Sequence, residues 1–307
     1  MSHITIITAF YNIKREDWGV ESRTDEKYFE QFKYWARIKN NLVVYVENEQ
    51  HKRRVKEIRE EFDLGEKTTI ITTGPMKSID EDLYMRMKAI AGNPILIDFH
   101  MANKNPEAWN VDYNYITGIK GWFVKDAVDR GLVQEVAAWL DFGFGHGNYT
   151  YKDSKEFSFE WKYDFPDNVS VYCMKELKDK PVFDIVRTGE VFFGGFMVVA
   201  AKHYWNEYWE LMRNCIVALL EVGLMDDDQT ILYMAYRLRP EFFHVEKTGW
   251  FTTLKEHGGE HLTLVDSKNR ISKKSSSFIK EFVHKVERKR NCKKYLKRQY
   301  KYLMDSE

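Results

Sequence analysis

The sequence predicts an α/β fold of the doubly wound type, and two patterns support this prediction. Short apolar, β-branched runs alternate with helical patterns over the first 72 residues, as in a parallel sheet with helices on its faces. A later run, 136–140, is continuously apolar, ends in Asp141 and leads into a turn with Gly143, Gly145 and Gly147. Ligands of open α/β sheets bind beyond the carboxyl ends of strands, so Asp141 is the first residue that we place in a candidate site.

The composition indicates a folded protein with a large core. The chain has 307 residues, of which 44% are hydrophobic and 15% aromatic, enough for one large α/β domain or two small ones. It contains no run of roughly 18 apolar residues, the length that a membrane span needs, and its first strand is not preceded by a cleavable leader. We therefore expect a cytoplasmic protein. Cys173, Cys215 and Cys292 fit no metal or redox spacing and are interpreted as buried or incidental thiols.

The first half of the chain predicts alternating strands and helices. Residues 4–10 form a strand so early that we expect it near the centre of the sheet. The other elements predicted here are helices over 27–39, 50–62, 80–91 and 121–130 and strands over 42–46, 68–72 and 136–140. Residues 95–100 also predict a strand, ending in Asp98 and His100. Because no glycines follow it, we rank Asp98 below Asp141 as a site residue.

The second half continues the pattern with longer elements. Strands are predicted over 169–173, 182–186, 191–200 and 242–245, and helices over 202–222 and from 224 to about 239. Gly194 and Gly195 interrupt the strand 191–200, which usually marks a bulge or a close backbone approach. The helix 202–222 has a broad apolar stripe, whose simplest meaning is core packing, and Gly223 ends it.

The net charge of zero conceals two oppositely charged regions. Residues 268–307 contain fourteen Lys and Arg against four Asp and Glu, a charge of about +10, so residues 1–267 carry about −10. A serine-rich stretch, 272–277, is typical of a linker. We therefore divide the chain into an α/β domain, 1–267, and a basic helical tail, 268–307, with an apolar edge that includes Phe278 and Phe282.

Several segments, taken in order, resemble one known family. They are Ile4-Thr-Ile-Ile-Thr-Ala-Phe-Tyr11, Arg23-Thr24, the aromatic pattern from Tyr28 to Asn41, Trp139-Leu-Asp-Phe-Gly143 and Asp226-Asp-Asp-Gln229. Over residues 4–255 the chain resembles the HtrL/YibB-type bacterial proteins, which look like GT-A glycosyltransferases of surface-polysaccharide loci. The basic tail lies outside the resemblance.

This resemblance implies both a fold and a reaction. The fold is a GT-A-like, Rossmann-type three-layer sandwich with a mixed central sheet. The reaction is transfer of a hexosyl residue, with galactose or galactofuranose favoured, from a UDP-sugar to a glycan or lipid-linked acceptor in lipopolysaccharide or capsule synthesis. Two alternatives stay open: a non-catalytic nucleotide-sugar- or glycan-binding protein that kept the fold, and a nucleotidyltransferase. The sequence contains no Gly-x-x-x-x-Gly-Lys-Ser/Thr loop to support the latter.

The resemblance also suggests which residues hold the donor. The end of the first strand would hold uracil and ribose through Thr8, Ala9, Phe10 and Tyr11, and Tyr11 would stack on the base; otherwise this is an ordinary strand end. Arg23 would neutralise the diphosphate with two hydrogen bonds or pair with a nearby carboxylate. Further donor contacts are expected from Asn114, Lys120, Asp141 and the backbone at Gly194 and Gly195.

A divalent cation is the expected cofactor, although the ligand set is incomplete. GT-A enzymes hold Mn²⁺ or Mg²⁺ on an Asp-x-Asp turn, and the cation stabilises the leaving UDP. Only Asp141 is present here, because the positions two residues before and after it, where the second aspartate would stand, are Trp139 and Gly143. His244 is the candidate second ligand, with His257 and His146 as alternatives. A lone histidine is more often not a ligand, so the need for a metal stays open.

The cluster Asp226-Asp227-Asp228-Gln229 has two interpretations. Acidic residues in a first helical turn favour the helix dipole and cap exposed amides, which accounts for one or two of them. In an inverting enzyme, Asp227 or Asp228 would take the proton from the acceptor hydroxyl, while Gln229 would hydrogen-bond a sugar. In a retaining enzyme the same residues would hold the donor sugar.

The basic tail suggests where the protein acts. A basic helix with one apolar edge is suited to an anionic membrane surface, so we expect peripheral binding to the inner face of the cell membrane. A solvated terminus is the simpler alternative. Nucleic acid is not an expected partner, because the acidic domain offers no second basic surface.

Overall fold

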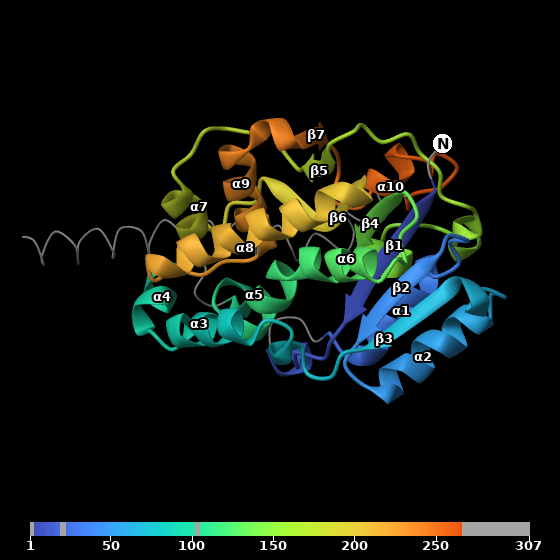
Figure 1. Ribbon diagram of the computed structural model, residues 1–307, viewed down its shortest axis with the longest axis horizontal. Helices are drawn as coiled ribbons and strands as arrows, with labels where there is room; N and C mark the ends of the chain where they lie inside the picture. Colours follow the sequence, from blue (N-terminus) through green and yellow to red (C-terminus); the bar gives the residue numbers. More distant parts are fainter. Residues whose placement is uncertain (1–2, 19–22, 102–104, 266–307) are drawn as a thin grey trace, which may run out of the picture.

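The computed structural model describes residues 3–18, 23–101 and 105–265, in which helices cover both faces of one mixed sheet (Figure 1). The strand order is β3-β2-β1-β4-β6-β5-β7. The strands are β1 (Ile4–Phe10), β2 (Leu42–Val46), β3 (Thr68–Thr72), β4 (Val136–Leu140), β5 (Val169–Cys173), β6 (Phe193–Ala201) and β7 (Phe243–Lys247). The first strand lies between β2 and β4, which confirms its predicted central position.

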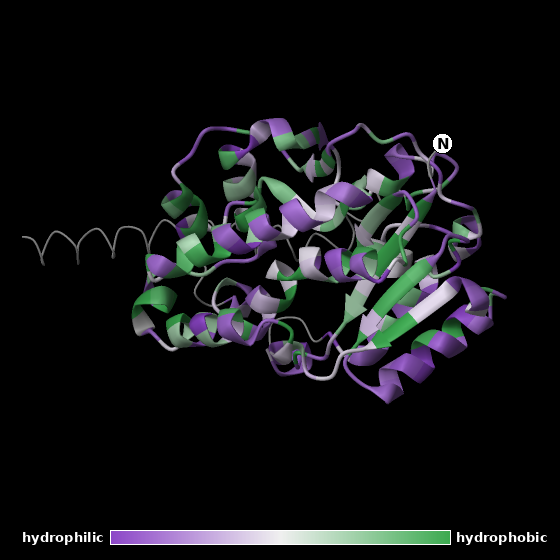
Figure 2. Ribbon diagram, in the orientation of Figure 1, coloured by the Kyte–Doolittle hydropathy of each residue, from purple (hydrophilic) through white to green (hydrophobic). Residues whose placement is uncertain are grey.

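Strands β1, β2, β4, β5 and β6 are buried almost throughout, because both faces of the sheet are covered there, whereas the edge strands β3 and β7 are partly exposed. Along β1, Ile4 and Ile6 pack into one core, while Ile7 packs into the other. Trp139 and Leu140 at the end of β4 divide between the cores in the same way, as the alternation of side chains along a strand requires. Figure 2 shows the apolar strands inside the molecule and a largely hydrophilic outer surface on α2 (Glu49–Glu60).

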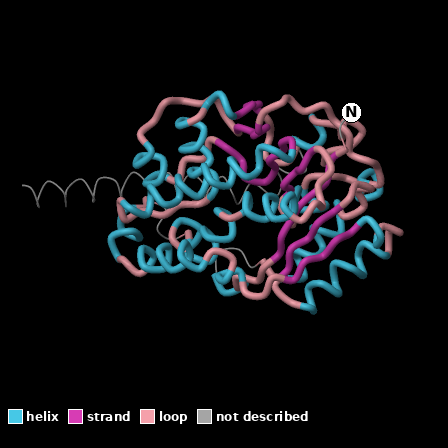
Figure 3. Tube along the Cα trace, viewed as in Figure 1, coloured by secondary structure: helices cyan, strands magenta, loops and turns pink. Residues whose placement is uncertain are grey.

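The helices form the two outer layers. One core lies beneath α1 (Asp25–Trp35), α2, α10 (Thr253–Glu256) and the irregular stretch 142–165. The other core lies beneath α3 (Glu81–Ala91), α4 (Pro94–Phe99), α5 (Val111–Gly118), α6 (Lys120–Asp129), α7 (Val182–Thr188), α8 (Trp205–Glu221) and α9 (Asp228–Leu238). Figure 3 shows the strands grouped among these helices. The architecture is therefore a mixed α/β sandwich, compatible with a Rossmann-like fold.

Two predicted strands are wrong, because both segments are helical. Residues 95–99 lie in α4, where the Asn93 side chain caps the helix and Pro94 occupies its first turn, and His100 follows as the C-cap. Residues 182–186 lie in α7, which follows Pro181 and ends at Gly189 in the left-handed conformation, with φ of 62°. Short apolar runs have no decisive period, so in both cases the flanking proline was the better signal.

The chain changes direction across the sheet between β1 and β4. From β1 it continues through β2 to β3 on one side, and later returns to place β4 on the other side of β1. Such a switch point opens a crevice at the carboxyl ends of the two strands. The antiparallel strand β6 also reaches this end, because the Asp141 amide donates to the Phe196 carbonyl at 2.9 Å.

Two further predictions concern the basic tail and membrane-spanning segments. The predicted basic tail, 268–307, lies outside the described residues. Within the described ranges, no helix combines the length and apolarity needed to cross a bilayer.

Candidate functional site

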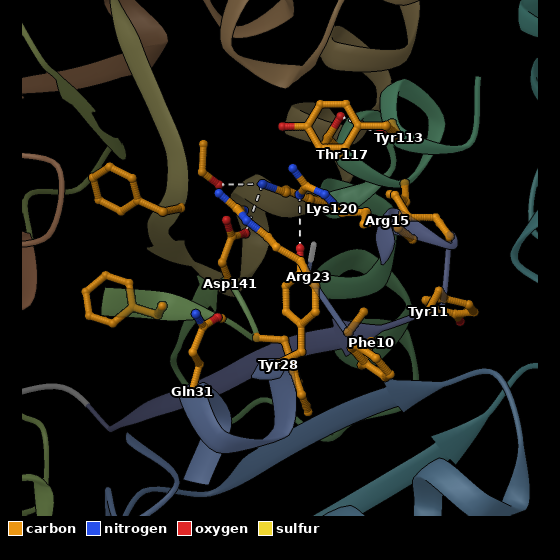
Figure 4. Close-up of a pocket in the computed structure, with 18 of the residues that line it drawn as sticks. Phe10, Tyr11, Arg15, Arg23, Tyr28, Gln31, Tyr113, Thr117, Lys120 and Asp141 are labelled. Carbon is orange, nitrogen blue, oxygen red and sulfur yellow. Dashed lines mark hydrogen bonds and ion pairs between the residues drawn. The ribbon is translucent and has the colours of Figure 1, made fainter. Parts of the chain in front are cut away.

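A cavity with a volume of about 320 Å³ opens at the switch point between β1 and β4 (Figure 4). This volume lies within the range of small-molecule sites, roughly 300–1,000 Å³. Nine of the residues predicted to bind the donor or to catalyse line it, namely Ala9, Phe10, Tyr11, Arg23, Lys120, Asp141, Gly195, Asp228 and Gln229. The fold therefore brings together residues from widely separated parts of the sequence.

Lys120, the first residue of α6, connects the acidic residues of the cavity. Its Nζ lies 2.9 Å from Asp141 Oδ1 and 2.8 Å from Asp228 Oδ2. It also donates to the Gly195 carbonyl at 2.8 Å. An ammonium group has three N–H donors, so each can be matched with one of these oxygens. We call Lys120, Asp141 and Asp228 the ion cluster.

Burial and charge act in opposite directions within the ion cluster. Burial disfavours the ammonium form of Lys120, yet the carboxylates of Asp141 and Asp228 hold its pKa above the ordinary value. Burial holds the pKa of Asp228 above its ordinary value; the positive charge of Lys120 opposes this effect, and the negative charge of Asp141 adds to it. Lys120 therefore stays charged, and its charge favours the ionised form of the buried Asp228 carboxylate.

Asp141 is held in place from its own strand. The indole Nε1 of Trp139 donates to Asp141 Oδ1 at 2.8 Å. Trp139 thus stands where an Asp-x-Asp motif would carry its first carboxylate, and it supplies a hydrogen-bond donor in place of a metal ligand. The side chain of Asp141 is 36% exposed, which leaves one side of the carboxylate open to the cavity.

Gly195 makes room for Asp228. A Cβ atom at position 195 would lie 1.8 Å from Asp228 Oδ2, so no other residue fits without displacing the carboxylate. At Gly194 a Cβ would lie 2.2 Å from the Phe196 ring, and Gly194 is not among the residues that line the cavity. The Gly-Gly pair was expected to bring backbone amides near a sugar; in the structure it accommodates two side chains instead.

The three aspartates at the start of α9 have different roles. Asp227 is the N-cap of α9, and its Oδ1 accepts a hydrogen bond from the backbone N–H of Gln229 at 3.1 Å. Asp226 accepts from the Thr230 hydroxyl at 2.8 Å. Asp228 alone of the three lines the cavity, with 5% of its surface exposed. Of the two candidate bases, Asp227 and Asp228, only Asp228 can therefore meet a ligand in the cavity.

Arg15 is a site residue that the sequence did not reveal. It lies in the short 3-10 helix Arg15–Trp18 after β1, donates to the Tyr28 hydroxyl at 3.0 Å and forms an ion pair with Glu107. Its guanidinium also lies 4.8 Å from the Trp18 ring centre and 5.0 Å from that of Tyr113. Arginines are common, and the only available signal was its position just beyond a strand that ends at the site.

Three predicted nucleotide contacts need correction. Thr8 is buried within β1, and Asn114 is buried in α5, where its Nδ2 donates to the carbonyls of Glu107 and Asn110 at 3.0 and 2.9 Å. Neither lines the cavity; Asn114 instead supports the turn that carries Glu107. Tyr11 does line the cavity, but it is 7% exposed and stacks on Phe123. Little of its ring is left for a base.

The predicted pairing of Asp141 with His244 on a metal is not supported. His244 lies on β7, three strands from β4, which corresponds to about 14 Å. His244 Nε2 forms a hydrogen bond with Glu246 Oε1 at 2.7 Å, and His257 Nε2 forms one with Glu246 Oε2 at 2.9 Å. His146 does line the cavity, where its ring lies 4.6 Å from that of Phe251.

The donor set itself also argues against the expected cation site. Within the described ranges, no three His, Cys, Asp or Glu side chains are grouped so that they could hold a metal ion. The two carboxylates of the ion cluster already share the Lys120 ammonium. The described residues therefore do not fit the divalent cation that the resemblance implies.

Comparison with known proteins agrees with the resemblance seen in the sequence. A family model described as "Bacterial protein of unknown function (HtrL_YibB)" matches residues 2–257. "Protein HtrL" of Escherichia coli (strain K12) is 29% identical over 273 residues, which cover 81% of this chain and 90% of that protein. The region that the family model matches includes every element that lines the cavity and ends before the basic tail.

Proposed function

The chain belongs to the HtrL_YibB family of bacterial proteins, and we propose that it is a glycosyltransferase of GT-A type that moves a hexosyl residue from a UDP-sugar to a saccharide acceptor. The observation that carries the proposal is the cavity at the switch point, where Asp228, Asp141 and two arginines meet. A nucleotide-sugar needs cationic groups for its diphosphate and a carboxylate near its reacting carbon. The sugar is proposed to be galactose or galactofuranose on the family resemblance alone.

The donor would occupy the end of the cavity built by the N-terminal segments. Arg15 and Arg23 provide guanidinium groups, which bind diphosphates through paired hydrogen bonds. Tyr28 and Tyr113 are half-buried and line the same end, so they offer more ring surface to uracil than Tyr11 does. In Figure 4 Arg15 lies between Tyr113 and Tyr28, and Arg23 extends toward Asp141.

The chemical step requires one base. The acceptor oxygen attacks the anomeric carbon of the donor, the bond from that carbon to the phosphate oxygen breaks, and UDP leaves with the electron pair. The acceptor proton passes to the carboxylate of Asp228, in the role that the sequence assigned to Asp227 or Asp228. Lys120 does not react: it holds Asp228 and Asp141 in position, and Gln229 lies beside them on the cavity wall.

UDP binding tests the donor half of this proposal. UDP should raise the melting temperature of the full chain, and Arg23→Gln should weaken UDP binding about ten- to hundredfold, because it removes charge-assisted hydrogen bonds. Lys27→Gln is the matched control, since it removes one positive charge from an exposed position of α1 outside the cavity. Absence of any shift with UDP would contradict the proposal.

Turnover tests the catalytic half. Incubation with UDP-galactose or UDP-galactofuranose and a panel of saccharides should release UDP, and Asp228→Asn should lower the rate at least about a hundredfold while UDP still binds. A specific observation favours the alternative of a non-catalytic binding protein: Lys120 already engages Asp228 Oδ2. UDP binding without release of UDP from any tested donor would support that alternative.

A further inference from the structure

The residues that line the cavity fall into two groups with different chemistry. The charged lining residues outside the ion cluster come from the stretches 15–16 and 23–25 and from position 107. They are Arg15, Glu16, Arg23, Asp25 and Glu107. A second group of lining residues comes from the turn after β4, from β6 and from the segment after β7. We call Phe144, His146, Phe196, Trp250 and Phe251 the aromatic wall; no Lys, Arg, Asp or Glu belongs to it.

The aromatic wall is a preformed surface. Phe144 and Phe196 are almost fully buried and hold the arrangement in place, with ring centres 6.1 Å apart. The rings of Trp250 and Phe251 lie 6.1 and 6.5 Å from that of Phe196. Trp250 is 43% exposed. A large aromatic ring, backed by buried rings and open on one side, is available to a ligand.

This surface and the ion cluster line the same cavity. Phe196 directly follows Gly195, whose carbonyl accepts from Lys120 and whose missing side chain makes room for Asp228. A ligand that lies on the aromatic wall therefore shares the cavity with the carboxylate that the proposed reaction uses as its base. Gln31 and Gln229 also line the cavity and can hydrogen-bond hydroxyl groups.

The chemistry of the wall selects an uncharged, partly apolar ligand. One face of a hexose ring is made of C–H groups, which pack on an aromatic ring while the hydroxyls at its edge reach polar groups. A phosphate or carboxylate placed there would lose its hydration, while the wall itself has no Lys or Arg and the Lys120 ammonium already contacts two carboxylates. We propose that the aromatic wall binds a neutral sugar ring of the acceptor, with Trp250 as its platform. This rests on the proposed glycosyltransferase function.

Saturation-transfer NMR on the full chain tests the proposal, with methyl β-D-galactopyranoside, methyl β-D-glucopyranoside and octyl β-D-galactopyranoside as probes. We expect saturation of the sugar-ring protons, and we expect Trp250→Ala to weaken binding about threefold to tenfold. Trp250→Phe should recover part of the loss. Phe183→Ala is the matched control, because Phe183 is an exposed ring outside the cavity, and it should leave binding unchanged.

The remaining outcomes separate this proposal from the glycosyltransferase proposal. Unchanged saccharide binding in Trp250→Ala, or no binding of any probe, would overturn the acceptor surface. Saturation confined to the octyl chain would assign the wall to a lipid and would also overturn it. UDP affinity is measured in the same samples: absence of UDP binding by the wild-type chain, with the sugar still bound through Trp250, counts against the glycosyltransferase proposal only.

Discussion

At the scale of single residues, the Lys120 ammonium balances the charge of the candidate site. The Lys120 side chain is 15% exposed, and the Asp228 side chain that it contacts is 7% exposed, so both charged groups have lost most of their hydration. Coulomb attraction is strong at such a position, yet it mainly offsets the cost of desolvation. The pair therefore specifies an arrangement rather than adding much stability, and removing only one partner should be costly.

Replacing Lys120 alone should expose that cost. Lys120→Met leaves Asp228 as a buried, unpaired carboxylate, and we expect the free energy of unfolding to fall by about 3–5 kcal/mol. The partly exposed Asp141 should contribute little to this loss. Urea denaturation of the full chain measures the change.

The double variant Lys120→Met/Asp228→Asn is the control, since it removes both buried charges together. It should recover most of the stability lost in the single variant. A single variant as stable as the wild type would show that Asp228 is not charged and unpaired when Lys120 is absent.

The close approach at Gly195 gives a second prediction at this scale. Gly195→Ala places a Cβ 1.8 Å from Asp228 Oδ2 and must displace the carboxylate, so we expect a loss of about 1–3 kcal/mol of stability together with the proposed activity. Gly92→Ala is the matched control, because the nearest atom to its Cβ would be 3.6 Å away. Similar melting temperatures for both variants would show that Asp228 does not need the space at Gly195.

At the scale of elements, the start of α9 concentrates negative charge where a helix favours it. The Asp227 side chain caps the helix, and Asp226 accepts hydrogen bonds from the Thr230 hydroxyl and the Asp227 amide. Burial nevertheless disfavours three adjacent carboxylates. It raises the pKa of Asp226 to about 7, with the negative charge of Asp228 adding to the effect and the hydrogen bonds opposing it.

This raised pKa predicts how stability depends on pH. The pKa of Asp226 is about 7 in the folded protein and roughly 3.9 in an unfolded chain, so the folded state binds more protons between these values. Its contribution to stability is then complete below about pH 4 and is lost as the pH rises through about 7. Relative to Asp226→Asn, the wild-type chain should become less stable by a few kcal/mol from about pH 4 to about pH 8.

Chemical denaturation of both proteins across this pH range measures the difference. Asn cannot titrate there, so it removes the Asp226 contribution while keeping the size of the side chain. A difference that is constant with pH, or one that grows in favour of the wild type as the pH rises, would show that folding does not raise the pKa of Asp226.

At the scale of the whole molecule, the site exists because the strand order brings distant segments together. Arg15 follows β1, Lys120 begins α6, Asp141 follows β4 and Asp228 begins α9. Each lies at the same end of the sheet, because β1 and β4 are parallel and adjacent while β6 runs back beside them. The basic tail lies outside the family match.

The tail gives a prediction for the whole chain. Its excess of about ten positive charges should bind the full chain to vesicles of phosphatidylcholine with phosphatidylserine, since each basic residue near an anionic surface contributes about 1 kcal/mol. Raising the salt concentration should weaken this binding. Co-sedimentation of the full chain and of a chain ending at residue 267 measures it. Equal sedimentation of both would remove the membrane proposal.

Local sequence patterns predict most strands, most helices, Asp141 and the acidic cluster that contains Asp228. Apolar continuity identified β1, β2 and β4, and the position of Asp141 directly after β4 placed it at the ligand end of the sheet. The acidic start of α9 was equally visible, although its composition could not separate Asp227 from Asp228. These features depend on local periodicity, which short-range sterics and the burial of one segment decide.

Which of these residues come into contact depends on how the whole chain folds. The order β4-β6-β5-β7 separates His244 from Asp141, and the lysine at position 120 reaches both carboxylates from the start of a helix that packs on the sheet. Arg15 is marked only by its position just beyond β1, and Trp250 carries no local mark of the cavity that it lines. Such distances depend on strand order and helix packing, which the summed burial of the whole chain selects, and no single segment contains that information.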